Sequence, residues 1–158
     1  MASILPPIPR VVFTVLEPLT LVAGFFAPFI SPEWFVAEQI ASSPLVDITQ
    51  NTKMVAYQLG NIYILLAMIG VAVLYTTTEA RVVRNYLIAL AIADVSHVGV
   101  TWYAMGHERA VDVASWNSMT WGNIGVTTLL FVVRLAYLAG LFGPDQQSPI
   151  AKKGGKLH

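Results

Sequence analysis

An acid and an imidazole stand in the apolar stretch "ALAIADVSHVGV", residues 89–100. Because residues three apart in a helix share a face, the carboxyl group of Asp94 and the ring of His97 are predicted to lie side by side. A carboxylate in a membrane with no cation at its depth takes up a proton rather than staying ionised. A carboxyl group that is neutral near pH 7 is a proton donor. We therefore predict that Asp94 acts as a general acid and that His97 orients or reprotonates it.

The composition indicates an integral membrane protein. Of the 158 residues, 56% are hydrophobic and only 11% are charged, and the mean hydropathy is +0.64, whereas roughly a quarter of the residues in soluble domains are charged. A net charge of zero offers no basic surface, so we expect no nucleic-acid partner. The chain has no cysteine, which excludes disulfides and thiolate ligands, and we expect neither a metal nor a cofactor.

Four apolar segments predict an all-α fold, an integral membrane four-helix bundle that forms a single domain. Each segment has the roughly 20 residues needed to cross the hydrocarbon, and they run approximately over residues 11–30, 54–75, 82–103 and 120–142. The short link "TTTEAR" predicts that the second and third helices form a tight antiparallel hairpin. The stretch "PEWFVAEQI" predicts a short interfacial helix, and residues 143–158 are predicted to form a polar cytosolic tail.

The distribution of basic residues predicts the orientation in the membrane. With four spans, both termini and the 76–84 loop lie on one side. That side holds Arg10, Arg81, Arg84, Lys152, Lys153 and Lys156, and the other side holds Lys53 and Arg109. We therefore expect cytosolic termini, in a protein of the endoplasmic reticulum membrane.

Depth in the membrane predicts a buried ion pair. Counted at the rise of a helix, Glu17 lies roughly 9 Å and Arg134 roughly 12 Å from the cytosolic ends of their helices. Either charge alone in hydrocarbon is costly, so Glu17 and Arg134 are predicted to face each other as a structural ion pair. The same count places no lysine or arginine level with Asp94. Glu17 is the alternative proton donor if its side chain reaches the same cavity.

Further polar and aromatic residues predict a substrate-binding cavity toward the lumenal mouth, roofed by two tryptophans and walled by amides. The predicted binding residues are Gln58, Asn61, Tyr63, Trp102, Trp116, Asn117, Trp121 and Asn123. The roof requires that the last helix begins by Ser115, which places both indoles on one face with the amides. The alternative interpretation is structural. Amides in membrane helices often form only interhelical hydrogen bonds, and tryptophans near helix ends anchor many membrane proteins at the interface.

Four blocks of the sequence resemble the motifs of a family of small fungal integral membrane proteins of about this length. The blocks are "PPIPRVVFTVLEPLTLVAGFFAPF", "YQLGNIYIL", "RVVRNYLIALAIADVSHVG" and "SWNSMTWGNIGVTTLLFVVRLAYLAG". The resemblance covers most of residues 6–140. Small fungal membrane proteins of this kind occur among the membrane-bound cyclases and isomerases of terpenoid and meroterpenoid biosynthesis, so the resemblance implies such an enzyme.

The polar residues agree with this chemistry. A cyclase of the protonation type needs a proton donor in a dry cavity, to open an epoxide or protonate an alkene, and aromatic faces to stabilise the carbocation. The chain has no aspartate-rich motif for diphosphate-bound magnesium. If the protein is a cyclase, it is therefore of the protonation type. A lipophilic substrate is expected to reach the site laterally from the bilayer and its lipids.

Two other classes of function remain open. The first is a non-catalytic protein that binds a lipid or sterol in the same cavity, or an accessory membrane subunit. Such a protein binds a ligand without converting it. In a proton-coupled carrier, Asp94 and His97 relay protons, but four helices without a repeat give little scope for alternating access unless the protein is a homo-oligomer. The sequence leaves the oligomeric state and the substrate open.

Overall fold

The computed structural model describes residues 4–40 and 47–146. Within these residues all regular secondary structure is helical, and four helical stretches are long and apolar enough to cross a membrane. They cover Pro7–Ile30, Gln50–Thr76, Ala80–Met105 and Ser118–Leu138. The predicted all-α bundle of four spans is confirmed, and each predicted span lies within a few residues of the observed one. Of the predicted polar tail, residues 147–158 lie outside the described part of the chain.

The first span contains a π-helical turn next to Pro18. The span comprises α1 (Pro7–Val11), the π-helix η1 (Val12–Leu16) and α2 (Glu17–Ile30). Proline has no backbone N–H, so the carbonyl of Thr14, four residues earlier, cannot receive the usual helical bond from Pro18. The hydroxyl of Tyr75 donates to that carbonyl instead, at 2.8 Å. The distorted turn ends where Glu17 begins α2, and π-helical turns are frequent at functional sites.

The last span also contains a π-helical turn. The span comprises α7 (Ser118–Thr120), the π-helix η3 (Trp121–Val126) and α8 (Thr127–Leu138). Asn117 caps its start, because Oδ1 of Asn117 accepts a hydrogen bond from the N–H of Thr120 at 2.8 Å. Two short elements, α6 (His107–Val111) and the 3-10 helix η2 (Val113–Ser115), precede this cap.

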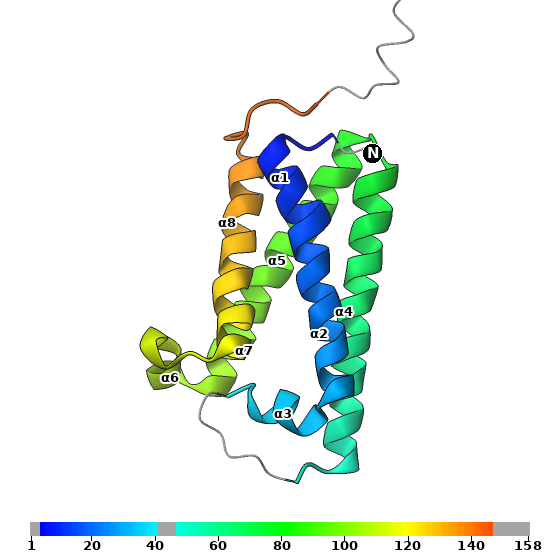
Figure 1. Ribbon diagram of the computed structural model, residues 1–158. Coiled ribbons are helices and arrows are strands. Elements are labelled where there is room, and N and C mark those ends of the chain that lie inside the picture. Colours follow the sequence, from blue (N-terminus) through cyan, green and yellow to red (C-terminus); the bar gives the residue numbers. More distant parts are fainter. Residues whose placement is uncertain (1–3, 41–46, 147–158) are drawn as a thin grey trace, which may run out of the picture.

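A short helix is present in the stretch "PEWFVAEQI" as the sequence predicted, namely α3 (Pro32–Ala37), which is shorter than the sequence indicated. The residues that follow it are tied to the last span. The side-chain N–H of Asn117 donates to the backbone carbonyl of Glu38 at 3.0 Å and to its carboxylate at 2.7 Å. The side-chain N–H of Asn123 donates to the amide oxygen of Gln39 at 3.2 Å. These contacts connect the elements at the end of the bundle that lies opposite the N-terminus (Figure 1).

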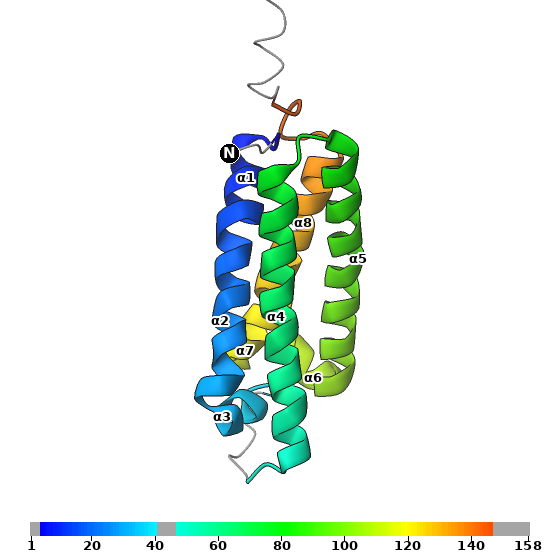
Figure 2. The same ribbon diagram turned by 90° about the vertical axis from the view of Figure 1, so that its right-hand side faces the viewer.

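The second and third spans run antiparallel, but the predicted tight hairpin is wrong. Helices α4 (Gln50–Thr76) and α5 (Ala80–Met105) are joined by residues 77–79, yet α4 packs mainly along α2, and α5 packs mainly along α8. Figure 1 shows α5 leaning across the bundle, and Figure 2 shows α4 beside α2. Small residues on α4 explain the partner choice. At Gly60, a Cβ atom would lie 2.8 Å from Cγ of Pro28 on α2, so only glycine permits this approach.

A hydrophobic cluster closes the end of the bundle where the chain begins. Its buried members are Ile4, Leu5, Phe13, Leu74, Val83, Leu87 and Tyr137. The N–H of Gln146 donates to the carbonyl of Ile4 at 2.7 Å, so the first and last described residues meet. They lie at the same end as the 77–79 link (Figure 1), as four spans require. The three lysines of the predicted cytosolic side that follow Gln146 lie outside the described residues.

Candidate active site

Arg134 binds two carboxyl groups that come from two other spans. It is fully buried; its Nη1 donates to Oδ2 of Asp94 on α5, and its Nη2 donates to Oε1 of Glu17 on α2. We call these three residues the carboxyl–guanidinium cluster. The predicted pairing of Glu17 with Arg134 is confirmed. The prediction that Asp94 has no cation nearby is wrong, because a guanidinium presents five donors in a rigid fork, so that one arginine serves acids on two helices.

The cluster contains two acids and one base, so its net charge depends on a single proton. With both carboxyl groups ionised the cluster carries one negative charge, and with one of them protonated it is neutral. Because net charge inside a membrane is costly, the neutral cluster with one transferable proton is favoured. The side chains of Glu17 and Asp94 are 12% and 11% exposed, whereas that of Arg134 is 0% exposed. The acids, and not the base, are therefore accessible.

A cavity of about 510 Å³ lies beside the cluster, and both acids line it. Its aromatic lining residues are Phe35, Tyr63 and Tyr86, and its other polar lining residues are Thr20, Ser96, His97, Asn123 and Thr127. Most of the remaining lining is aliphatic, so the cavity suits a lipophilic molecule. Among residues 4–40 and 47–146, no group of three or more His, Asp or Glu side chains is arranged to hold a metal ion.

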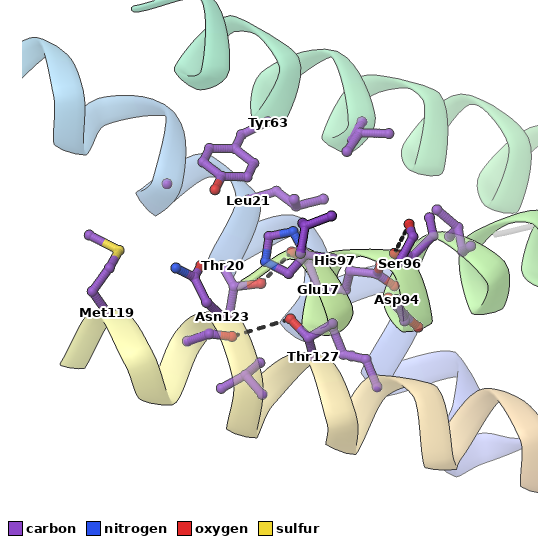
Figure 3. Close-up of a pocket in the computed structure, with 18 of the residues that line it drawn as sticks. Glu17, Thr20, Leu21, Tyr63, Asp94, Ser96, His97, Met119, Asn123 and Thr127 are labelled. Carbon is purple, nitrogen blue, oxygen red and sulfur yellow. Dashed lines mark hydrogen bonds between the residues drawn. The ribbon is translucent and has the colours of Figure 1, made fainter. Parts of the chain in front are cut away.

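Asp94 and His97 line the same cavity, as their spacing predicted, and they are close enough to interact electrostatically. Figure 3 shows His97 near Glu17 and Asp94, between the ribbons of α2, α5 and α8. Tyr63 reaches into the same space from α4, as Figure 3 also shows. Tyr63 and Asn123 are the two predicted binding residues that the structure places in the lining.

Two glycines make room for the tyrosines of the cavity. The ring of Tyr63 lies against α2 at Gly24, where a Cβ atom would be 2.9 Å from Cδ2 of the ring. The hydroxyl of Tyr86 lies against α4 at Gly70, where a Cβ atom would be 2.9 Å from Oη. Each tyrosine therefore takes its position because the residue opposite has no side chain.

Tyr86 is a cavity residue that the sequence analysis did not predict. Tyrosines near the ends of membrane helices are common interface anchors, so the residue type alone gives no reason to select it. Its spacing is the signal that was available. Tyr86 stands eight residues before Asp94, which is just over two helical turns, and Leu90 stands halfway between them. All three residues line the cavity.

Three predicted binding residues on α4 and α5 do not line the cavity. Gln58 and Asn61 are exposed, and α4 turns small residues such as Gly60 toward its neighbours instead. Equal depth with Asp94 suggested contact, but the rotation of α4 about its own axis decides which residues face inward. Trp102 is also exposed, and its ring lies 5.7 Å from that of His107. The predicted roles of Gln58, Asn61 and Trp102 in this cavity are therefore wrong.

The predicted tryptophan roof is also wrong. Trp116 and Trp121 pack edge to face with ring centroids 5.0 Å apart, and neither lines the cavity. The reason is the position of the cap. Because Asn117 caps α7, the last span begins at Ser118 and Trp116 lies outside the helix. Helical spacing therefore does not place the indole of Trp116 on the same face as that of Trp121. The side chain of Asn117 serves the cap and the contact with Glu38, so its role is structural.

Comparison with known proteins identifies a family. A family model described as a domain of unknown function, DUF7704, matches residues 2–144. No curated protein matches the chain, and no solved structure matches it. The match covers all four spans and every residue of the carboxyl–guanidinium cluster and the cavity.

Proposed function

The chain belongs to the DUF7704 family, and we propose that it is a membrane-bound cyclase or isomerase that starts its reaction by giving a proton to a lipophilic substrate. The observation that carries this proposal is the pair of carboxyl groups that share one buried guanidinium at the wall of an apolar cavity. The sequence blocks resemble a family of small fungal integral membrane proteins, and the occurrence of such proteins among the membrane-bound cyclases and isomerases of terpenoid and meroterpenoid biosynthesis supports the same class of reaction.

The proposed reaction is an acid-initiated isomerisation. The protonated carboxyl group of Asp94 or Glu17 gives its proton to an alkene carbon or to an epoxide oxygen. When an epoxide is protonated, its C–O bond breaks, the electron pair stays on oxygen, and a carbocation forms. The π electrons of a second alkene close the ring. A neighbouring carbon then loses a proton to the carboxylate, which restores the acid, and the product has the mass of the substrate.

Arg134 and several residues that line the cavity have roles in this scheme. Arg134 stabilises the carboxylate that remains after proton transfer, because charge-assisted hydrogen bonds hold both acids to it. Phe35, Tyr63 and Tyr86 supply aromatic faces to the carbocation, in place of the tryptophans that the sequence suggested. His97 is placed beside Asp94 to orient the substrate or to return a proton.

Turnover by microsomes that contain the protein tests this proposal. A panel of epoxyprenyl phenols is supplied, and products of unchanged mass are sought by chromatography and mass spectrometry. In Asp94→Asn the remaining acid ionises against Arg134 and holds no transferable proton, and the same holds for Glu17→Gln. Both variants should therefore lose about 10²- to 10⁴-fold in rate. The control is Glu108→Gln, which alters an exposed acid on α6 and should keep wild-type turnover.

The outcomes separate the enzyme from the other classes. Wild-type turnover by Asp94→Asn or by Glu17→Gln would overturn the proposed role of the cluster. Tight binding of the phenols without conversion would favour a non-catalytic lipid-binding protein. Proton uptake into sealed vesicles that depends on the phenols, again without conversion, would favour a proton-coupled carrier.

A further inference from the structure

We infer that the cavity binds an uncharged lipid that carries an oxygen function, and that Tyr63 and His97 hold this oxygen by hydrogen bonds. The inference rests on the proposed function in that it concerns the same cavity. It names the ligand class, which excludes phosphorylated lipids and favours an alcohol, ether, epoxide or ketone over a plain hydrocarbon.

The hydrogen-bonding state of the lining indicates where a ligand oxygen is needed. Three hydroxyl groups of the cavity are already bonded to carbonyls of their own helices: Thr20 to Glu17 at 2.8 Å, Ser96 to Ala93 at 2.9 Å, and Thr127 to Gly122 at 3.3 Å. The hydroxyls of Tyr63 and Tyr86 and the ring nitrogens of His97 make no hydrogen bond to any residue that the structure describes, and of these the Tyr86 hydroxyl is directed against α4 at Gly70.

A polar group that faces hydrocarbon is costly to leave without a hydrogen-bond partner, and both Tyr63 and His97 line the largely apolar cavity. Figure 3 shows both side chains directed into the space between the helices, from α4 and α5 respectively. A phenol is a donor, and a neutral imidazole is a donor on one nitrogen and an acceptor on the other. An oxygen atom of the ligand that accepts from the phenol O–H of Tyr63 and from the imidazole N–H of His97 satisfies both donors together.

The charges around the cavity exclude an anionic head group. Glu17 and Asp94 line it, and no lysine or arginine is among the described lining residues. Arg134 is fully buried behind the two acids and is engaged by both of them. A phosphate in the cavity would therefore meet carboxyl groups without a free cation, and this like-charge contact opposes its binding.

Binding of three fifteen-carbon probes to the purified protein, measured by native mass spectrometry from detergent, tests this inference. The probes are farnesol, farnesyl monophosphate and the saturated hydrocarbon farnesane. Farnesol should bind at one molecule per chain, and the monophosphate should bind at least about tenfold more weakly because of the carboxyl groups. Farnesane, which forms neither of the two hydrogen bonds, should bind roughly 5- to 100-fold more weakly than farnesol.

A matched pair of variants assigns the effect to Tyr63. Tyr63→Phe removes only the hydroxyl group, and it should weaken farnesol binding by roughly 3- to 10-fold while leaving farnesane binding unchanged. The control is Tyr103→Phe, because Tyr103 is 89% exposed and lies outside the cavity lining. The inference is wrong if farnesyl monophosphate or farnesane binds as tightly as farnesol, if no farnesol binds, or if Tyr63→Phe binds farnesol like the wild type.

These measurements are independent of catalysis. If Asp94→Asn retains wild-type turnover while farnesol binds selectively, the proposed reaction fails and the ligand class stands. If turnover depends on both acids while all three probes bind equally, the ligand class fails and the reaction stands.

Discussion

Arg134 is fully buried and binds acids from the first and third spans. Its guanidinium also lies over the ring of Phe13, with Cζ 5.2 Å from the ring centroid. A buried ion pair is not stabilising as such, since both groups must leave water. Removing one partner is costly, however, because the other charge then remains buried without compensation. In this protein the substitution of Arg134 leaves two buried acids, one of them ionised, without their base.

Arg134→Met tests the structural role of the cluster. The variant leaves Glu17 and Asp94 together in the membrane without a base, and unfolding should become easier by about 3–5 kcal/mol, the usual cost of breaking a buried pair. The triple variant that also carries Glu17→Gln and Asp94→Asn should recover most of this loss, since no unpaired charge remains. Thermal unfolding in detergent, monitored by size-exclusion chromatography, measures the loss of stability in the single variant and its recovery in the triple variant. A single Arg134→Met variant as stable as the wild type would contradict this role.

At the residue scale, the sequence predicted correctly the contact that depends only on the depth of two residues in the membrane. It failed where the contact depends on the rotation of a helix about its axis or on the residue at which a helix begins. Glu17 and Arg134 are level, so their pairing followed from counting. The sequence analysis paired each base with one acid only, so it did not predict that Arg134 binds Asp94 as well as Glu17. Trp116 was misplaced because Asn117 was taken as part of the helix rather than as its cap.

At the scale of elements, glycines on neighbouring helices determine where the tyrosines of the cavity lie. Gly24 on α2 accommodates the ring of Tyr63, and Gly70 on α4 accommodates the hydroxyl of Tyr86. Sequence alone indicates small residues at helix contacts, but not which side chain each one accommodates. For the same reason the pairing of α4 with α2 was not foreseen, because the short link to α5 suggested the wrong neighbour.

Gly24→Ala tests whether the helix contact controls the cavity. The added methyl group would lie 2.9 Å from the ring of Tyr63, so the ring must move. We expect weaker farnesol binding and lower stability, although alanine is by itself the better helix former by roughly 1 kcal/mol. The control is Gly99→Ala on α5, where a Cβ atom would have no neighbour within 4 Å, and this change should be neutral or slightly stabilising. Equal farnesol affinities of the two variants would show that Gly24 does not set the position of Tyr63.

At the scale of the whole molecule, the bundle has two different ends. One end brings together the first described residues, the 77–79 link and Gln146. The other end carries α3, α6 and α7 (Figure 1), and there the hydrogen bond of Asn123 with Gln39 joins the residues that follow α3 to the last span. The cavity lies among the spans, so a lipophilic ligand that enters from the bilayer does not need to cross water.

The orientation of these ends is a prediction that follows from the basic residues. We propose that the termini face the cytosol and that the protein resides in the endoplasmic reticulum membrane. A glycosylation acceptor placed between α6 and α7 should then be modified in cells, and one placed after residue 158 should not. Modification of the C-terminal acceptor alone would reverse the orientation.

The central claim is that Glu17 and Asp94 share one proton above Arg134, and infrared difference spectroscopy of the purified protein in lipid tests it most directly. The wild type at neutral pH should show the carbonyl stretch of a protonated carboxyl group, which disappears in Asp94→Asn and also in Glu17→Gln. Each substitution leaves one acid, which pairs with Arg134 in its ionised form. Absence of the band from the wild type, or its survival in either single variant, would contradict the account.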